Sequence, residues 1–156
     1  MKKNKIIKFI AAIVICQLAG AIGTVFTSPS LYDDLQKPSF APPNWLFAPV
    51  WITLFTLMGI SLYLVLDKDL KNKETKKGLI IFGIQLFLNT LWSFLFFGLK
   101  SPFYGLINII VLEFFIAVTI FQFSKISKYA AMLLIPYIIW VTIATFLNYS
   151  IWLLNP

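Results

Sequence analysis

The sequence predicts an all-α membrane protein, a single domain over residues 1–156 built as a bundle of five transmembrane helices. Of its 156 residues, 60% are hydrophobic and only 12% are charged, and the mean hydropathy is +0.87. A soluble domain carries about 25% charged residues. The charges are also clustered, and they leave apolar stretches of the ~20 residues that cross ~30 Å of hydrocarbon. A membrane β-barrel would instead show alternating segments of about 10 residues.

Short polar segments and helix-capping residues separate the five predicted helices. Residues 27–30 (TSPS) end the first helix, and the polar segment 67–78 connects the second to the third. Gly98 closes the third helix, while Ser101 and Pro102 open the fourth as N-cap and first helical residue. The predicted helices cover residues of about 6–26, 45–66, 79–98, 103–123 and 130–153.

The lysines predict the orientation. Cytoplasmic loops of membrane proteins are rich in basic residues, and eleven of the thirteen lysines fall on the side of the N-terminus. We therefore expect a plasma-membrane protein with a cytoplasmic N-terminus and with the 27–44 loop and the C-terminus outside. This distribution explains the +7 net charge without nucleic acid. The first apolar run is too long for a signal peptide and lacks a cleavage site, which indicates a retained helix. The eleven lysines are Lys2, Lys3, Lys5, Lys8, Lys68, Lys71, Lys73, Lys76, Lys77, Lys125 and Lys128, against Lys37 and Lys100.

Several kinds of chemistry are disfavoured by composition. The chain has no histidine, and its single cysteine, Cys16, lies in an apolar segment. Histidine is the commonest metal ligand and the commonest general base at neutral pH. No disulfide, zinc site, iron–sulfur site or histidine-ligated haem is therefore expected, and the sequence predicts neither a metal nor a resident cofactor.

The stretch KPSFAPPNWLFAPVW (37–51) ends the first loop and enters the second helix. Its prolines restrict the backbone before any ligand binds. One interpretation is an interfacial aromatic belt, with Trp45 and Tyr32 at the level of the lipid headgroups. Trp51 lies too deep for a belt, which favours a second interpretation, a lid over a pocket between the helices.

The third, fourth and fifth helices supply walls for such a pocket. Each repeats aromatic and amide side chains at spacings of three and four, so these side chains share one helix face. Amides are unfavourable against lipid and should point into the bundle. For one amide alone, an interhelical hydrogen bond of about 0.6 kcal/mol is the simpler explanation. Together they indicate an aromatic slot for a large planar ligand. The residues concerned are Gln85, Asn89, Trp92, Tyr104, Asn108, Trp140, Ala144, Leu147 and Asn148.

Three blocks carry a resemblance to the TspO/MBR family, the translocator proteins or peripheral benzodiazepine receptors. They are KPSFAPPNWLFAPVW, LNTLWSFLFFG and PYIIWVTIATFLNYSIWLLN, in this order along nearly the whole chain. The resemblance implies a five-helix bundle, a homodimer, and a cavity capped by the first loop that binds protoporphyrin IX, isoquinoline carboxamides and benzodiazepines. It implies ligand contacts from Tyr32, Pro42, Trp51, Asn89, Trp92, Tyr104, Ile107, Asn108, Trp140, Ala144 and Leu147.

Two positions depart from the family pattern and point to a bacterial-type member. Phe40 stands where many members have tryptophan, and Leu153 stands where mammalian members have arginine. The proposed cholesterol motif needs a basic residue after Tyr149, and none follows, so high-affinity sterol binding is not expected.

Three functions remain open from the sequence. The first is a receptor for tetrapyrroles, with transport as a variant of it. The second is light- and oxygen-dependent breakdown of bound protoporphyrin IX, in which Trp51 and Trp140 would be the oxidisable groups. The third is a small secondary transporter without tetrapyrrole chemistry. It is the weakest, because the sequence shows no internal repeat and only one midplane charge, Glu113.

Three further features have two interpretations each. Glu113 lies about 140° round its helix from Asn108, so we expect it to be protonated or paired at a helix contact or oligomer interface and not to contact the ligand. Pro136 should bend the fifth helix, either to fit the bundle or to shape the slot. A small-residue stripe on the first helix either packs within the monomer or forms a dimer seam. The stripe comprises Ala12, Cys16, Gly20 and Thr24.

Overall fold

A computed structural model describes residues 2–156, with side chains from residue 3 onward; the Lys2 side chain counted above lies outside the described part. All regular secondary structure in the described chain is helical, and five of its helical segments are long and apolar enough to cross a membrane. The predicted fold class is therefore confirmed. The elements are α1 (Lys2–Phe26), α2 (Pro29–Asp34), α3 (Asn44–Leu66), α4 (Lys73–Ser93), the π-helical turn η1 (Phe94–Gly98), α5 (Pro102–Ser124), α6 (Lys128–Met132) and α7 (Ile135–Leu154).

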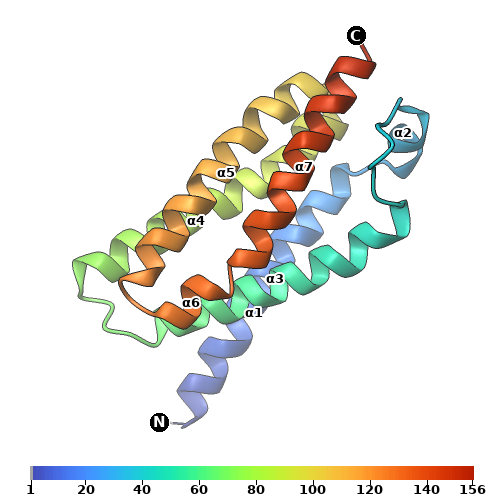
Figure 1. The fold of residues 1–156 in the computed structure, drawn as a ribbon. Helices are drawn as coiled ribbons and strands as arrows, with labels where there is room; N and C mark the ends of the chain where they lie inside the picture. The colour runs from blue at the N-terminus through green and yellow to red at the C-terminus, as the bar shows by residue number, and fades with distance from the viewer. Residues whose placement is uncertain (1) are drawn as a thin grey trace.

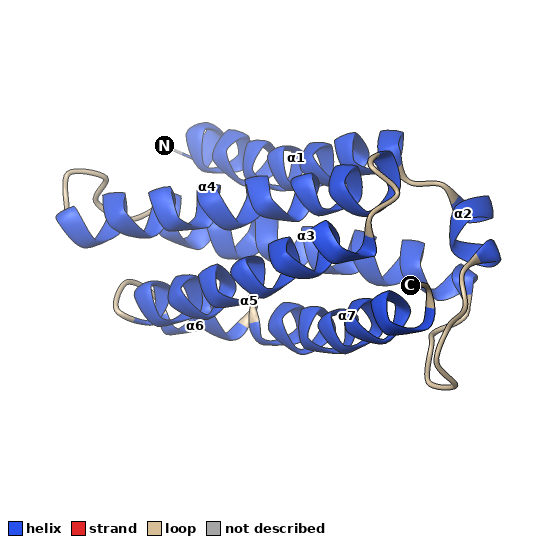
Figure 2. Ribbon diagram, turned by 90° about the horizontal axis from the view of Figure 1, so that it is seen from above, coloured by secondary structure: helices blue, strands red, loops and turns tan. Residues whose placement is uncertain are grey.

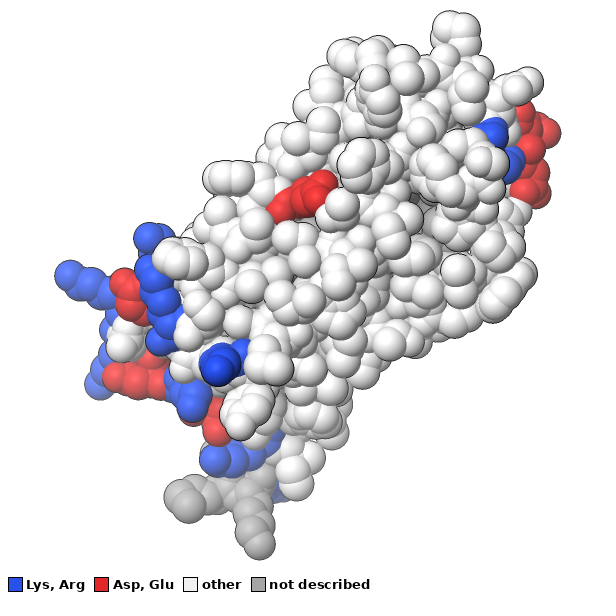
Figure 3. All heavy atoms as spheres, viewed as in Figure 1, with Lys and Arg blue, Asp and Glu red and all other residues white. Residues whose placement is uncertain are grey.

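The long helices form an elongated bundle (Figures 1 and 2). Apart from an acidic patch midway along the face shown, the charged side chains gather at its two ends and leave a wide apolar surface between them (Figure 3). The lysine-rich end carries the N-terminus, and there Lys5 pairs with Asp67 at 3.1 Å and Lys125 with Glu74 at 3.9 Å. The opposite end carries α2 and the C-terminus (Figure 1). This separation of charge is what a bundle spanning a bilayer requires.

The fifth predicted helix is interrupted, which corrects its expected course. A turn at Leu133 and Leu134 divides it into α6 and α7. Pro136 does not bend a continuous helix, because it lies in the first turn of α7, where its missing N–H costs nothing. Ser127 caps α6 by accepting a hydrogen bond from the Ala130 amide.

Two elements were not expected from the sequence. The first loop contains α2, which Ser28 caps by accepting from the Leu31 amide and which Pro29 begins. The third span ends in η1, where the Leu99 amide donates to the Phe94 carbonyl at 2.9 Å. Such a bulge rotates the residues that follow it relative to those before it.

Small residues bring α1 and α3 into close contact in the middle of the bundle. Ala12 and Cys16 are fully buried. A Cβ added to Gly20 would lie 2.5 Å from the Phe55 ring, and one added to Gly59 would lie 2.5 Å from the Ile13 Cα. Packing within the monomer therefore accounts for most of the small-residue stripe on α1.

Gly59→Ala is expected to destabilise the bundle by more than about 2 kcal/mol. The added methyl meets backbone, which cannot move aside as a flexible side chain would, so α1 and α3 must separate. The measurement is unfolding in a mild detergent by circular dichroism. Gly83→Ala is the control, because a Cβ at Gly83 meets nothing within 4 Å, and it should stabilise α4 by about 0.5–1 kcal/mol. Equal stabilities of the two variants would contradict this account of the α1–α3 contact.

Candidate ligand-binding site

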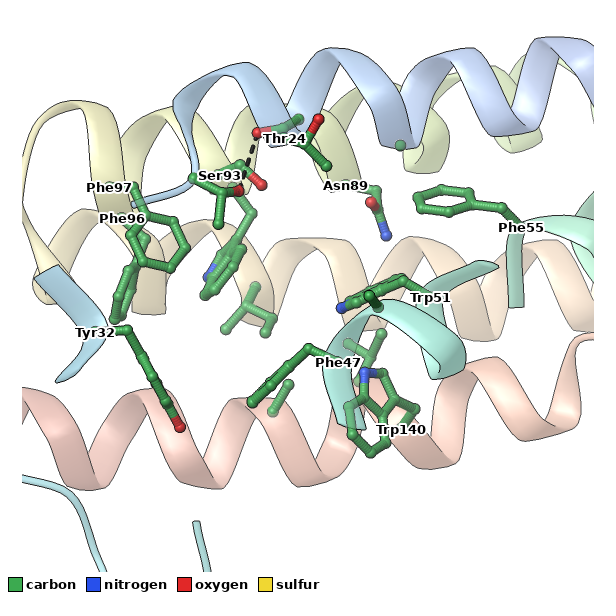
Figure 4. Close-up of a pocket in the computed structure, with 18 of the residues that line it drawn as sticks. Thr24, Tyr32, Phe47, Trp51, Phe55, Asn89, Ser93, Phe96, Phe97 and Trp140 are labelled. Atoms are coloured by element: carbon green, nitrogen blue, oxygen red, sulfur yellow. Dashed lines mark hydrogen bonds between the residues drawn. The ribbon is translucent and has the colours of Figure 1, made fainter. Parts of the chain in front are cut away.

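A cavity of about 570 Å³ lies inside the bundle, at the end that carries α2. This volume is within the range of small-molecule sites. Its wall comes from α1, α2, α3, α4, η1, α5 and α7. Figure 4 shows its aromatic side chains converging from several of these helices.

Seven of the predicted site residues line this one cavity. They come from four elements that are far apart in the sequence, α2, α3, α4 and α7. The short helix α2 contributes Tyr32, which is 8% exposed and packs against the cavity side of the bundle. The seven residues are Tyr32, Trp51, Asn89, Trp92, Trp140, Ala144 and Leu147.

Four predicted residues do not line the cavity. Tyr104 and Ile107 are 54% and 48% exposed on the outer surface of α5, so the expectation that Tyr104 points inward is wrong. Asn108 is buried, but its side-chain amide donates to the Leu88 carbonyl at 2.9 Å and so joins α5 to α4. Pro42 lies in the loop before α3 and is not among the lining residues.

Sequence reasoning missed several phenylalanines of the wall. Phe47 and Phe55 lie one turn to either side of Trp51 on α3, and Phe96 lies one turn after Trp92. The spacing of four was available as a signal, because it places these residues on the same face as the tryptophans. With sixteen phenylalanines in the chain, residue type alone did not single them out.

The aromatic rings are held in pairs. Trp51 stacks on Phe55 with ring centroids 5.5 Å apart and an interplanar angle of 30°. Phe47 meets Trp140 edge-to-face at 5.9 Å, which bridges α3 to α7. Such pairs contribute about 0.5–1.5 kcal/mol beyond area burial. The slot is therefore preformed and does not have to be assembled by the ligand.

A buried amide fixes Trp92, which stacks on Phe96 at 4.9 Å. The Trp92 Nε1 donates to the Asn148 Oδ1 at 2.9 Å. The Asn148 Nδ2 in turn donates to the Pro102 carbonyl at 2.8 Å. One side chain on α7 thus connects α4 to the first turn of α5 and sets the orientation of the Trp92 ring in the cavity wall.

A second hydrogen-bond chain runs inward from the cavity. The Asn89 Nδ2 donates to the Tyr137 hydroxyl at 2.8 Å, and that hydroxyl donates to the Gln85 Oε1 at 2.9 Å. Tyr137 is 1% exposed, and its ring meets Trp51 edge-to-face at 6.3 Å. The chain satisfies polar groups that would otherwise be costly inside the bundle.

Two hydrogen-bond donors in the cavity wall have no partner among the described residues. They are the Tyr32 hydroxyl and the Trp140 Nε1, and both atoms are buried. Burial, and after it the neighbouring Asp33 carboxylate, raises the pKa of Tyr32, so the phenol stays protonated at neutral pH and remains a donor. A buried unpartnered donor is rare and usually marks a site for water or ligand.

The first loop covers the cavity and is held by hydrogen bonds within the loop, to Asn155 after α7 and from Asn44 of α3 to Asp33. The Lys37 ammonium donates to the carbonyls of Tyr32, Asp33 and Leu35, at 2.7, 3.2 and 3.1 Å, and so holds the end of α2. The Gln36 backbone and the Asn155 side chain exchange two hydrogen bonds of 3.0 Å. These contacts support the lid interpretation of the loop.

Lys37→Met is expected to loosen α2 while the rest of the bundle stays folded. Hydrogen bonds from a charged donor contribute about 1.5–3 kcal/mol, so amide exchange in residues 29–37 should accelerate by roughly 10- to 100-fold. Hydrogen exchange with mass spectrometry measures this directly. Lys100→Met, the other lysine expected on that side, is the control. Unchanged exchange in Lys37→Met would show that the ammonium does not hold the lid.

Glu113 lies outside the cavity lining. The Thr142 and Thr145 hydroxyls of α7 approach its two carboxylate oxygens at 2.5 and 2.9 Å. This is the helix contact named above as one of the alternatives, and it places the carboxylate between α5 and α7.

The fold and the cavity together define a class of protein: a multi-pass membrane protein whose helix bundle encloses a preformed aromatic site beneath its first loop. The chain matches the TspO/MBR family over residues 12–153 and belongs to that family. It is 43% identical to the tryptophan-rich protein TspO of Chlorobaculum tepidum over 156 residues, 98% of this chain and 99% of that one. It is 39% identical to protein CrtK of Rhodobacter capsulatus over 148 residues (95% and 92%) and 39% identical to the human translocator protein over 124 residues (78% and 72%).

Proposed function

We propose that this protein is a membrane receptor for flat, lipophilic tetrapyrroles, with protoporphyrin IX as the ligand that suits the cavity best. The observation that carries the proposal is the preformed slot of paired aromatic rings with two donors that have no partner among the described residues, the Tyr32 hydroxyl and the Trp140 Nε1. A planar ring system fits between aromatic faces. Carboxylate or carbonyl oxygens on the ligand would accept from the two donors. Isoquinoline carboxamides and benzodiazepines share the flat ring and the carbonyl.

Light- and oxygen-dependent degradation of the bound porphyrin is a second candidate. Three of the chain's five tryptophans line the cavity. A porphyrin bound there would transfer light energy to oxygen beside oxidisable indoles, and Trp51 and Trp140 are the proposed participants. Within the part of the chain that the structure describes, the cavity wall includes no carboxylate, lysine or cysteine, so hydrolysis or group transfer has no obvious acid, base or nucleophile in it. Carriage of tetrapyrroles across or along the membrane without chemistry is the alternative.

Titration of the purified protein with protoporphyrin IX tests both candidates. Tryptophan quenching and Soret absorbance are followed in the dark and then under light. We expect saturable binding in the dark, and absence of saturation would remove this ligand class. A new photoproduct that requires the protein favours degradation, whereas ordinary bleaching of the bound pigment favours a receptor or carrier. If degradation involves the named indoles, Trp51→Phe and Trp140→Phe keep dark binding but change the photoproduct or its rate.

We further propose a location in the plasma membrane, with the lysine-rich end cytoplasmic and α2 and the C-terminus outside, because eleven of the thirteen lysines fall at that end. A homodimer is proposed from the family resemblance. No resident cofactor or metal is proposed, and the porphyrin is assigned as ligand or substrate.

A further inference from the structure

Helices α1 and α3 are in contact only along part of their length. Starting at the lysine-rich end, Phe9 packs on Tyr63 at 5.2 Å, and Ile13 lies against Gly59. The last contact in this series is Gly20 against Phe55. Among the described residues, the hydrogen bond between α1 and α3 that lies nearest the α2 end joins Gln17 to the Ile52 carbonyl, and no aromatic pair joins the two helices beyond Gly20 and Phe55.

Beyond Gly20, α1 turns to other partners. A Cβ added to Gly23 would lie 3.2 Å from the Ser93 Oγ of α4. The Phe26 ring meets Phe94 of η1 at 5.3 Å. In α3, Pro49 lies inside the helix near the α2 end. A proline at such a position removes a backbone hydrogen bond and is a usual cause of a helix bend. The two helices are therefore packed on each other at one end and on different neighbours at the other.

Where α1 and α3 separate, some of their residues both line the cavity and are solvent-exposed. Ala21 and Thr24 of α1, and Ala48 and Ile52 of α3, all line the cavity, and all four are solvent-exposed. Ile52 is 59% exposed. A residue that lines an internal cavity and is also exposed on the surface lies at an opening of that cavity.

The rim of this opening is apolar and suited to lipid. Three of the four residues between the two helices have hydrocarbon side chains, and the Thr24 hydroxyl donates to the Ala21 carbonyl of its own helix at 2.7 Å. Towards the first loop, the exposed lining residues are Thr27, Pro29 and Asn44, and the side chains of Thr27 and Asn44 donate to the Gly23 carbonyl and to Asp33. No unpaired polar group is therefore presented to the bilayer. Gln17 closes the inner corner, where its Nε2 donates to the Ile52 carbonyl at 3.0 Å and to the Thr56 hydroxyl at 2.9 Å.

We infer that the opening between α1 and α3 is a lateral portal, through which a lipophilic ligand moves between the cavity and the bilayer leaflet on the α2 side. The inference rests on the proposed function, because the portal gives the proposed ligand a route between the bilayer and the binding cavity. It also explains how the lid stays closed: Lys37 and Asn155 hold the first loop in place, and a ligand that enters from the side does not need these bonds to break. The partner of the portal is the lipid phase, and its substrates are molecules that dissolve there.

The test measures the rates of protoporphyrin IX binding to the protein in vesicles by stopped-flow tryptophan quenching. Ala48→Trp places a bulky ring in the portal from α3, and Ala21→Trp does so from α1. We expect each to slow association and dissociation by at least tenfold, with Kd changed less than threefold, because a barrier on the route affects both directions equally. Ala117→Trp, at an exposed alanine of α5 outside the cavity lining, is the control and should leave both rates unchanged.

Entry over the first loop predicts the opposite pattern. In that case the portal variants bind at wild-type rates and Asn155→Ala speeds both association and dissociation, which overturns the portal. A raised Kd with unchanged association in both portal variants also overturns it, because the added rings would then be filling the cavity and not blocking a route.

A second measurement separates failure of the portal from failure of the porphyrin proposal. Ser93 lines the cavity and faces α1 (Figure 4), and a Ser93→Cys variant in a Cys16→Ala background gives the cavity a single thiol. In vesicles, a long-chain N-alkylmaleimide that dissolves in the bilayer should label this thiol at least tenfold more slowly once Ala48→Trp is added. Labelling by a charged, water-soluble maleimide at the same rate, with no effect of Ala48→Trp, overturns the portal whatever the protein binds.

Discussion

Replacing Trp51 with alanine should weaken protoporphyrin IX binding by roughly 30- to 100-fold. Trp51 lies at the centre of the aromatic wall, stacked on Phe55 and edge-to-face with Tyr137. Loss of an aromatic wall of this kind typically costs about 2–3 kcal/mol of binding free energy, and each 1.4 kcal/mol is a factor of ten. The dissociation constant is measured in the dark by Soret absorbance, which does not depend on the number of tryptophans left in the protein.

The matched control for Trp51→Ala is Trp152→Ala. Trp152 is also half-buried and contacts aromatic rings, Phe103 at 5.5 Å and Tyr149 at 6.1 Å, but it does not line the cavity. Its removal should cost stability and leave the affinity within threefold of wild type. If both variants lost affinity equally, the effect would come from general loosening of the bundle and not from the cavity.

Asn148→Leu should lower both stability and affinity. The leucine is similar in size, but it leaves the Trp92 Nε1 without its acceptor and the Pro102 carbonyl without its side-chain donor, in a place where Asn148 is 1% exposed. Each buried group left unsatisfied costs about 1–3 kcal/mol. The expected result is a loss of about 2–4 kcal/mol in unfolding free energy in detergent, together with at least fivefold weaker binding, because the Trp92 ring is no longer held in the wall.

Asn108→Leu is the control for the loss of affinity expected of Asn148→Leu. Asn108 is also a buried asparagine, and its bond to the Leu88 carbonyl joins α4 to α5 outside the cavity lining. This variant should lose stability but keep its affinity. An Asn148→Leu protein that binds protoporphyrin IX normally would show that the orientation of Trp92 does not matter for the ligand.

The five spans and the inward faces of Trp51, Trp92 and Trp140 were predictable from the sequence. Length and hydropathy are local properties of a membrane helix, since the backbone satisfies its own hydrogen bonds. The spacing of three and four then places amides and aromatics on one face, and Asn89 and Asn148 do point inward.

Other features depend on contacts that no local pattern encodes. The fifth span breaks at Leu133 and Leu134, before the proline that was expected to bend it. Tyr104 and Asn108 were expected on one inward face of α5, but Tyr104 is exposed and only Asn108 is buried. Residues four apart are separated by about 40° around a helix, so two residues near the edge of the buried face can fall on different sides of it. The π-helical turn η1 was not foreseeable, because nothing in FLFFG marks the extra residue.

The lid and the portal also became visible only in three dimensions. The two hydrogen bonds that hold the first loop to the C-terminal end of the chain join Gln36 to Asn155, 119 positions away. The portal is defined by where α1 leaves α3 after Gly20, which depends on the partners of Gly23 and Phe26 in α4 and η1. Sequence periodicity reports which face of a helix is buried, but not which neighbour buries it.

The measurement that tests the central claim most directly is to illuminate the protoporphyrin IX complex in oxygen and map the oxidised tryptophans by mass spectrometry. The five tryptophans form an internal comparison: Trp51, Trp92 and Trp140 line the cavity, whereas Trp152 does not and Trp45 is 72% exposed outside it. A ligand in the cavity predicts early oxidation of the three cavity tryptophans, which saturates with porphyrin and is suppressed by an isoquinoline carboxamide competitor. Oxidation that falls first on Trp45 and Trp152, or that the competitor does not affect, would contradict the assignment of the cavity as the binding site.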